Sequence, residues 1–315
     1  MAIYDPLGLI AHYLMYLKVL LQEIWRTKVG WDDKIEQHLL EKICCLESVE
    51  IPRCYLRHGA GIDKAIVELH TFVDASESGF AAVSYFRFEL DGHIECSLIG
   101  SKTRVAPIKF VSIPRLELQA AVVGSRLAQS IAKGHSIEIH RRFFWTDARD
   151  VVCWLQSDHR RYSQFVAFRV GEILETTNIS EWRWLRTKHN VADDGTKWKS
   201  RPDLKPTSRW FAGPPFLWKP RNEWPVSTLN GEETSKEIRA NLLHHTEDEV
   251  ETVIQPENYS SWQRLRRVTA FVQRFVRNIK KSQNRHSMFL GPLRQEELFA
   301  AQVFLFKKAQ PFRRM

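Results

Sequence analysis

Strand character appears in residues 66–104, which read IVELHTFVDASESGFAAVSYFRFELDGHIECSLIGSKTR. β-Branched and aromatic residues are concentrated in three runs, 66–76, 80–90 and 93–104, and such residues favour extended structure. The pair Asp91-Gly92 separates the second run from the third, and an Asp-Gly pair is typical of a tight hairpin turn. The pattern predicts a three-stranded antiparallel meander.

The segment after the meander mixes helices with two further strands. Pro114 stands where a first-turn proline is tolerated, and apolar residues then recur at helical spacing, at Leu116, Ala120, Val123, Leu127 and Ile131. Residues 137–147 and 181–187 have strand character, helices are predicted over 151–154 and 164–176, and a final helix should follow the turn at 193–194. This order predicts the α/β fold class, with one mixed five-stranded sheet and helices on its faces.

Four carboxylates occupy comparable places in this pattern. Asp74 lies inside the first strand, Glu117 lies in the first turns of a helix, Asp147 ends the strand FFWTD, and Asp193 opens the last helix. An ionised carboxylate among buried aromatic residues is costly unless a cation or hydrogen bonds compensate it, and several converging carboxylates repel one another unless metal lies between them. Two hard cations about 3.5–4 Å apart, held by such groups, can hydrolyse a phosphodiester bond.

Taken singly, each acid has a simpler explanation as a helix cap or an exposed charge, and Asp193 in particular could N-cap its helix. Asp194 lies at the same helix start and could replace or supplement Asp193. The interpretation as a metal centre therefore depends on the order, spacing and element type of the four acids together. It leaves open which of the two neighbouring aspartates is the fourth ligand.

Four motifs, FVDAS, RLELQAA, FFWTDARDVVCWLQSDHRRYSQFVAFRVGEI and WRWLRTKHNVADDGT, make residues 66–200 similar to the ribonuclease H (RNase H) domain of Bel/Pao-type LTR retrotransposon polyproteins. The run DPLGLIAHYLMYLKVLLQEIWRTKVGWDD resembles the segment that connects reverse transcriptase to RNase H in these elements, so the resemblance covers most of residues 4–225. It implies an RNase H-like fold whose catalytic, metal-binding acids are Asp74, Glu117, Asp147 and Asp193.

The resemblance also implies an activity and its partners. An endoribonuclease of this type hydrolyses the RNA strand of RNA/DNA hybrids with two Mg²⁺ or Mn²⁺ ions, and it reads the shape of the hybrid instead of its base sequence. Other segments of a retroelement polyprotein are expected as further partners. Five candidate nucleic-acid-binding residues lie near the acids: Ser76, Arg149, Lys188, His189 and Asn190. His189 could move protons or help release product, or it could be an ordinary solvent-exposed histidine.

Some features of the chain depart from the RNase H pattern. Ala148-Arg149 follows Asp147 where serine is frequent, and NVADDGT stands in place of an N-P-A-D run. The sequence contains no Y-x-D-D polymerase motif and no cysteine/histidine zinc module, so it resembles the excised middle of a polyprotein.

Two other functions stay open at this point. Segments of this kind are also catalogued as a Pao retrotransposon peptidase family, and Asp74-Ala75-Ser76 faintly resembles the D-[ST]-G loop of aspartic peptidases, although it lacks the glycine of that loop. The third alternative is a catalytically inactive, nucleic-acid-binding remnant of the polyprotein.

The composition, 43% hydrophobic and 26% charged residues, is ordinary for a globular protein. No apolar run reaches the roughly 18 residues of a membrane span, and the N-terminus does not have the pattern of a signal peptide. We therefore expect an intracellular protein, cytoplasmic or nuclear, that is neither secreted nor inserted in a membrane. The five cysteines form no C-x-x-C pair, which argues against both a disulfide framework and structural zinc.

The chain divides into four regions by pattern. Residues 1–65 form a helical segment resembling the reverse transcriptase connection, 66–200 the RNase H-like domain, 201–256 a Pro/Trp-rich connector with an acidic linker, and 257–315 a basic helical tail. The first region contains a helix with a wide apolar face, formed by Leu14, Leu17, Leu20, Leu21, Ile24 and Trp25. A further helix is predicted over 33–46.

The positive charge of the chain is concentrated in the tail. Residues 257–315 contain 13 Lys and Arg against 3 acids, while the whole chain has a net charge of +9. Helices are predicted over 262–281 and 294–309. The first has an apolar stripe, Trp262, Leu265, Val268, Phe271, Val272, Phe275 and Ile279, opposite the cations Arg264, Arg266, Arg267, Arg274 and Lys280. Docking of the stripe onto the main body is the simpler expectation, and contact of the basic face with nucleic acid is the more specific hypothesis.

Overall fold

The computed structural model describes residues 4–28, 30, 32–43, 50–51, 54–55, 64–198, 201–225, 237, 254, 256–280 and 291–309. The chain forms two units, Met1–Arg239 and Ala240–Met315, and each is described by itself below. In the described part of the chain, none of the helices combines the length and the apolar character that crossing a membrane would require.

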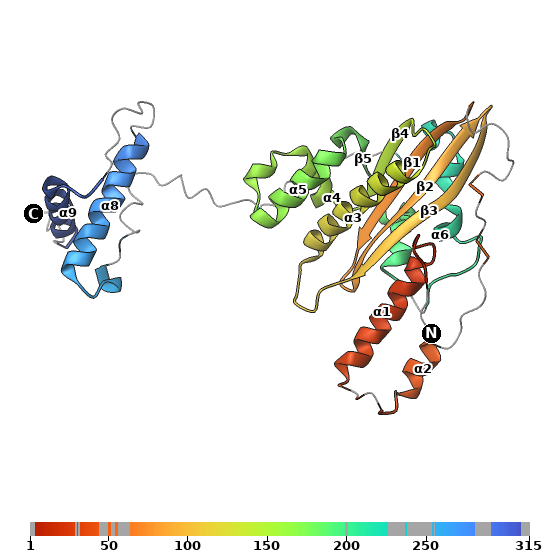
Figure 1. Cartoon of the computed structure of the whole chain (residues 1–315), viewed down its shortest axis with the longest axis horizontal. Coiled ribbons are helices and arrows are strands. Elements are labelled where there is room, and N and C mark those ends of the chain that lie inside the picture. Colours follow the sequence, from red (N-terminus) through yellow and green to blue (C-terminus); the bar gives the residue numbers. More distant parts are fainter. Residues whose placement is uncertain are drawn as a thin grey trace, which may run out of the picture. The chain divides into compact units, whose positions relative to one another are not determined.

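The first unit is built on a single mixed sheet of five strands (Figure 1). The strands are β1 Ile66–Ala75, β2 Gly79–Leu90, β3 His93–Val105, β4 Arg141–Thr146 and β5 Trp182–Trp184. Their order in the sheet is β3-β2-β1-β4-β5, with β1, β2 and β3 antiparallel and with β4 and β5 parallel to β1. The predicted α/β fold class, with a mixed sheet of five strands, is confirmed.

Three helices cover one face of the sheet: α3 Ile113–Gly134, α4 Arg149–Gln156 and α5 Gln164–Thr176 (Figure 1). The predicted hairpin turn lies between β2 and β3, and both of its central residues have positive φ, +49° at Asp91 and +81° at Gly92, as the right-handed twist of a hairpin favours. Helix α3 packs closely on β1 at Gly124, where a Cβ atom would lie 2.4 Å from Val73 Cγ1. Only glycine allows this approach, which fixes α3 and its acid against the end of β1.

Segments from both ends of the unit cover the opposite face. Helix α1 Ala11–Arg26, the short helix α6 Arg209–Ala212 and the 3-10 helix η6 Pro215–Trp218 lie there. Trp210 is buried in this layer: the hydroxyl of Tyr85 on β2 donates to its carbonyl oxygen at 2.6 Å, and its own indole N–H donates to the carbonyl of Leu9 at 3.0 Å. The polypeptide on both sides of residues 66–200 therefore contributes to the core of the sheet.

Two local predictions in this unit are corrected by the structure. The strand predicted from residue 137 begins at Arg141. The final helix predicted after Asp193-Asp194 is instead a 3-10 helix, η5 Val191–Gly195, which contains both aspartates. Its last residue, Gly195, lies tightly against β2, where a Cβ atom would come within 2.9 Å of the Ala81 methyl group.

The two N-terminal helices also differ from the prediction. The buried face of α1 is narrower than predicted. Leu21 and Trp25 of α1 are 53% and 58% exposed, because the small cluster around Tyr13, Tyr16 and Leu20 accommodates only one side of the helix. The second helix, α2 Gln37–Ile43, lies within the predicted range 33–46, whose last residues fall outside the described part of the chain.

The second unit contains the two predicted tail helices, α8 Trp262–Lys280 and α9 Gln295–Ala309, which pack on each other. The helical pattern predicted that Arg274 lies on an open basic face of α8, and the structure corrects this. Its guanidinium is buried between the helices, where it pairs with Glu297 and donates to the carbonyl oxygens of Gly291 and Pro292. Phe271 and Phe275 of the predicted apolar stripe are 49% and 65% exposed, because α9 covers only part of that stripe.

Candidate metal centre

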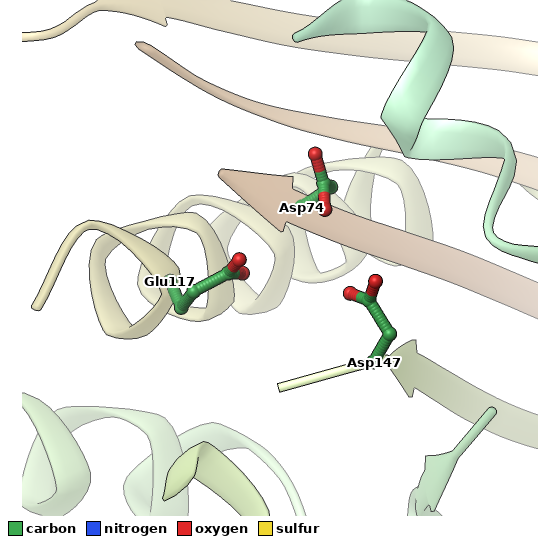
Figure 2. A group of neighbouring side chains, drawn as sticks. All are labelled: Asp74, Glu117 and Asp147. Carbon is green, nitrogen blue, oxygen red and sulfur yellow. The ribbon is translucent and has the colours of Figure 1, made fainter. Parts of the chain in front are cut away.

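Three of the four predicted acids meet at one end of the sheet (Figure 2). Asp74 is next to last in β1, and Asp147 directly follows β4. Because β1 and β4 are parallel neighbours with Val73 opposite Thr146, the two aspartates come side by side. Glu117, in the second turn of α3, points toward them, and one carboxylate oxygen from each acid lies within 4.8 Å of the other two.

Two of the three acids are buried, and the triad is incompletely hydrogen-bonded. Asp74 is fully buried, Glu117 is 8% exposed and Asp147 is half-buried. Within the described residues, neither Asp74 Oδ1 nor Glu117 Oε2 has a hydrogen-bond partner; Lys197 Nζ is 3.5 Å from Asp74 Oδ1, which is an ion-pair distance without hydrogen-bond geometry. Buried polar oxygens without a partner are rare, since each costs the desolvation of the group. A hard divalent cation, which prefers several carboxylate oxygens, fits this donor set.

The electrostatics of the triad lead to the same interpretation. Burial, together with the neighbouring Asp147, raises the pKa of Asp74 to about 7. Burial and the charges of Asp74 and Asp147 raise the pKa of Glu117 to about 9. Without a cation, the chain therefore tends to hold protons on these groups at neutral pH. A bound divalent ion would stabilise all three in the ionised form.

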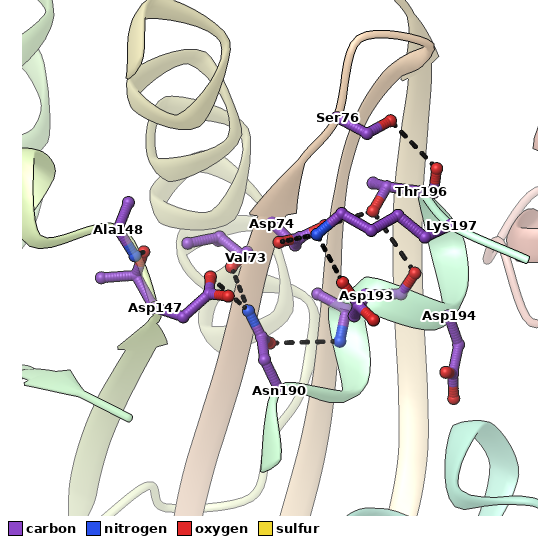
Figure 3. A network of polar contacts seen from close by, with 12 residues as sticks. Val73, Asp74, Ser76, Asp147, Ala148, Asn190, Asp193, Asp194, Thr196 and Lys197 are labelled. Carbon is purple, nitrogen blue, oxygen red and sulfur yellow. Dashed lines mark hydrogen bonds and ion pairs between the residues drawn. The ribbon is translucent and has the colours of Figure 1, made fainter. Parts of the chain in front are cut away.

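Asn190 was predicted to contact nucleic acid, and the structure corrects this. Its side chain is fully buried, so a substrate cannot reach it. The amide nitrogen donates to the carbonyl of Val73 at 2.9 Å and to Asp147 Oδ1 at 3.1 Å, while the amide oxygen accepts from the backbone N–H of Ala192 (Figure 3). Asn190 is thus a positioning residue that orients Asp147 and ties η5 to β1.

Replacing Asn190 with Ala should weaken Mn²⁺ binding by about 10–100-fold, the usual effect of losing a group that orients a metal ligand. Isothermal titration calorimetry would measure the dissociation constant. Asn178→Ala is the matched control, because Asn178 caps the exposed 3-10 helix η3 Ile179–Glu181. That control should lower the stability slightly and leave the metal affinity unchanged. Equal affinities in the wild-type protein and Asn190→Ala would show that Asp147 needs no such support.

Asp193, the fourth predicted acid, is not part of the triad. Its Oδ1 lies 2.6 Å from Lys197 Nζ, and this ammonium separates it from Asp74 (Figure 3). Asp194 points elsewhere and forms a two-pronged ion pair with Arg209, at 2.8 Å from Nε and 2.5 Å from Nη2. Of the two neighbouring aspartates, Asp193 is therefore the one that faces the centre.

Two residues of the centre were missed at the level of sequence. Thr196 donates from its hydroxyl to Asp74 Oδ2, and Lys197 forms ion pairs with Asp74 and Asp193. A signal for Lys197 was present, since it follows Asp193 by four residues, a spacing at which opposite charges meet on a helical turn. No local pattern pointed to Thr196, whose partner is 122 positions away.

The other candidate nucleic-acid contacts differ in how available they are. Ser76 is half-buried, and its hydroxyl donates to the carbonyl of Thr196 at 3.0 Å. Arg149 and Lys188 are exposed, and the Arg149 guanidinium lies 5.1 Å from the centre of the Trp184 ring. His189 is half-buried. Its burial is the largest cause that lowers its pKa, and the positive charges of Lys188 and Arg186 lower it further. Arg149 and Lys188 remain the cations that a substrate can reach.

Residues 1–148 match the family model described as the Pao retrotransposon-like RNaseH-like domain, and the match includes all three acids of the triad. This segment is therefore similar to the Pao retrotransposon-type RNase H-like domain, and it is called the Pao-type domain below. The resemblance to Bel/Pao-type polyproteins is thereby confirmed, although the matched family model stops before β5 and η5. No curated protein matches the sequence.

Two solved structures are similar to part of the chain. One is the N-terminal RNase H domain of a Mycobacterium tuberculosis protein, fused to maltose-binding protein, with 11% identity over 41% of this chain and 91% of that chain and a TM-score of 0.28. The other is RNase H1 of the halophilic archaeon Halobacterium salinarum NRC-1, with 11% identity over 40% of this chain and 89% of that chain and a TM-score of 0.23.

Proposed function

We propose that the Pao-type domain is a metal-dependent endoribonuclease that hydrolyses the RNA strand of RNA/DNA hybrids. The observation that carries this proposal is the triad of Asp74, Glu117 and Asp147, in which two buried oxygens have no hydrogen-bond partner among the described residues. A structural role alone would not favour three acids this close, because the chain bears the cost of their burial and mutual repulsion. Binding of Mg²⁺ or Mn²⁺ removes that cost.

The residues of the triad would hold the ion, and their neighbours would fix its ligands. Thr196 donates to one oxygen of Asp74, and Asn190 donates to one oxygen of Asp147, so each aspartate has one oxygen oriented by the protein. Glu117 comes from α3, whose position is set by the packing at Gly124. A divalent ion in this place supplies activation of the attacking water and stabilisation of the leaving oxygen in phosphodiester hydrolysis.

Substrate binding would depend on exposed cations at the same end of the sheet. Arg149 lies two residues after Asp147, at the start of α4, and Lys188 lies just before η5. Both are suited to phosphate contacts, which position a nucleic acid without reading its sequence. An A-form hybrid offers phosphates and 2′-hydroxyl groups across a wide minor groove, which supports the choice of an RNA/DNA hybrid as substrate.

The site does not favour the peptidase alternative. Asp74 lies within a central strand and not in a turn, and its nearest acids are contributed by a helix and by the end of β4. A peptidase dyad needs two aspartates from equivalent loops that share one proton. The inactive remnant is the outcome that a direct test of activity has to exclude.

Purified protein should cleave the labelled RNA strand of a hybrid in Mg²⁺ or Mn²⁺, and Asp74→Asn and Asp147→Asn should each lower the rate by about 1,000-fold or more. Gel analysis of the products measures the rate. Asp158→Asn, a change at an exposed acid outside the triad, is the matched control and should cleave like the wild-type protein. Intact hybrid after incubation of folded protein with either metal would contradict the proposal and support the inactive remnant.

A further inference from the structure

The ammonium of Lys197 lies inside the acidic centre. Its Nζ is 2.6 Å from Asp193 Oδ1 and 3.5 Å from Asp74 Oδ1, so it bridges the two carboxylates (Figure 3). The side chain starts just after η5, and 45% of it is exposed. Part of the Lys197 side chain is thus exposed to solvent, while its ammonium group reaches the buried Asp74.

A second divalent ion of the predicted centre would bind at this position, between the carboxylates of Asp74 and Asp193. The predicted two-ion centre has both Asp74 and Asp193 among its four acidic ligands. Mg²⁺ and Mn²⁺ bind carboxylate oxygens at about 2.0–2.2 Å, so an ion between Asp74 and Asp193 would occupy the space that Lys197 Nζ occupies. Two cations cannot share that space, because like charges at such distances repel strongly.

The two acids on either side of Asp74, Asp193 and Glu117, also differ in how far the chain neutralises their charge. Asp193 is already compensated by the chain, since Lys197 lies at 2.6 Å from one oxygen and Arg209 Nη2 at 4.0 Å from the other. Glu117 forms no ion pair with a Lys or Arg among the described residues, and its Oε2 is buried without a hydrogen-bond partner. The chain thus leaves one cation site to be filled at the triad and fills the neighbouring one with its own side chain.

We propose that the ammonium of Lys197 takes the place of a second divalent cation, so that the centre binds one ion at Asp74, Glu117 and Asp147. This inference rests on the proposed nuclease function and deepens it. An ammonium has three donors, and the hydrogen bond to Asp193 uses one of them. A remaining donor is available for a phosphate oxygen of the nucleic acid, which gives Lys197 a direct role in binding the reacting strand.

The test is the stoichiometry of Mn²⁺ binding to the full chain, followed by the electron paramagnetic resonance signal of free Mn²⁺ and by titration calorimetry. The wild-type protein should bind one ion, and Asp74→Asn should bind none. Lys197→Met should bind two ions, and its first ion should bind at least about tenfold tighter, because a positive charge next to the site is gone. Lys133→Met, at the exposed C-terminal end of α3, is the matched control and should bind one ion like the wild-type protein.

The possible results separate this inference from the proposed function. Two ions in the wild-type protein would overturn the role of Lys197 and leave the metal-dependent nuclease standing. One ion in both the wild-type protein and Lys197→Met would also overturn that role. No ion in the wild-type protein would overturn the metal centre itself. Lys197→Gln serves as a second charge-removing variant, and circular dichroism would show that each variant is folded before its ions are counted.

Discussion

Glu117→Gln should abolish hybrid cleavage and at the same time stabilise the metal-free protein. Activity should fall by about 1,000-fold or more, because an amide cannot replace a carboxylate as a ligand of a hard cation. Stability should rise because the buried Glu117 carboxylate has neighbouring acids and, among the described residues, no hydrogen-bond partner for Oε2. Few substitutions combine a loss of function with a gain in stability, and a functional site under electrostatic strain is where we expect one.

The gain in stability depends on pH in a definite direction. Burial raises the pKa of Glu117 from 4.5 to about 9, so the folded protein keeps a proton that the unfolded chain has released. The free energy of unfolding of the metal-free wild-type protein should therefore fall as the pH rises from about 4.5 to about 9. At about 1.4 kcal/mol for each pKa unit, Glu117→Gln should be more stable than the wild-type protein by roughly 3 kcal/mol at pH 7. Asp74, whose pKa is raised to about 7, adds to the slope in both proteins.

Urea unfolding in EDTA, at several pH values, would measure these differences. Glu138→Gln is the matched control, because Glu138 is exposed and its replacement should change neither the activity nor the slope. Saturating Mn²⁺ should reverse the order of stability, since only the wild-type protein retains the full set of ligands. A Glu117→Gln protein that is less stable than the wild-type protein in EDTA at pH 8 would contradict this account of the centre.

Arg87→Met should lower the free energy of unfolding by about 3–5 kcal/mol, the range expected when one member of a buried ion pair is removed. Arg87 is fully buried on β2, and its Nη1 donates to the buried Glu68 at 3.0 Å. Its guanidinium also donates to the carbonyl oxygens of Leu217 and Lys219, which follow the RNase H-like region in the chain. The variant removes one donor from a buried carboxylate and from each of two carbonyl groups, although the methionine fills part of the volume.

Urea unfolding followed by tryptophan fluorescence measures this loss, and limited proteolysis around residues 217–219 would show whether that segment detaches from the sheet. Arg141→Met is the matched control, because Arg141 lies 3.5 Å from the same Glu68 but half of its side chain is exposed. Exposed pairs contribute little, so the control should lose less than about 1 kcal/mol. Equal losses in both variants would mean that the buried network does not anchor residues 217–219.

The main elements of the fold and the three acids of the candidate centre could be predicted from the sequence, because the signals for both are local. A run such as IVELHTFVDA becomes a strand from the character of adjacent residues, and Asp91-Gly92 specifies a hairpin turn by its own backbone preferences. Once β1 and β4 are recognised as strands, the acids near their ends are expected at one edge of the sheet. The sequence alone therefore predicts that Asp74 and Asp147 lie close together.

Features that depend on distant partners were decided only by the tertiary structure. Asn190 looked like a substrate contact until its contact with Asp147, 43 positions away, showed it to be internal. Arg274 appeared on a basic helical face, yet Glu297 of the next helix neutralises it. The fourth acid could not be settled from spacing, because Arg209 draws Asp194 aside and Lys197 reaches between Asp193 and Asp74. A periodic pattern predicts which residues share one face of a helix or strand. Only tertiary packing decides which charged groups from distant segments come into contact, and the chemistry of this centre depends on those contacts.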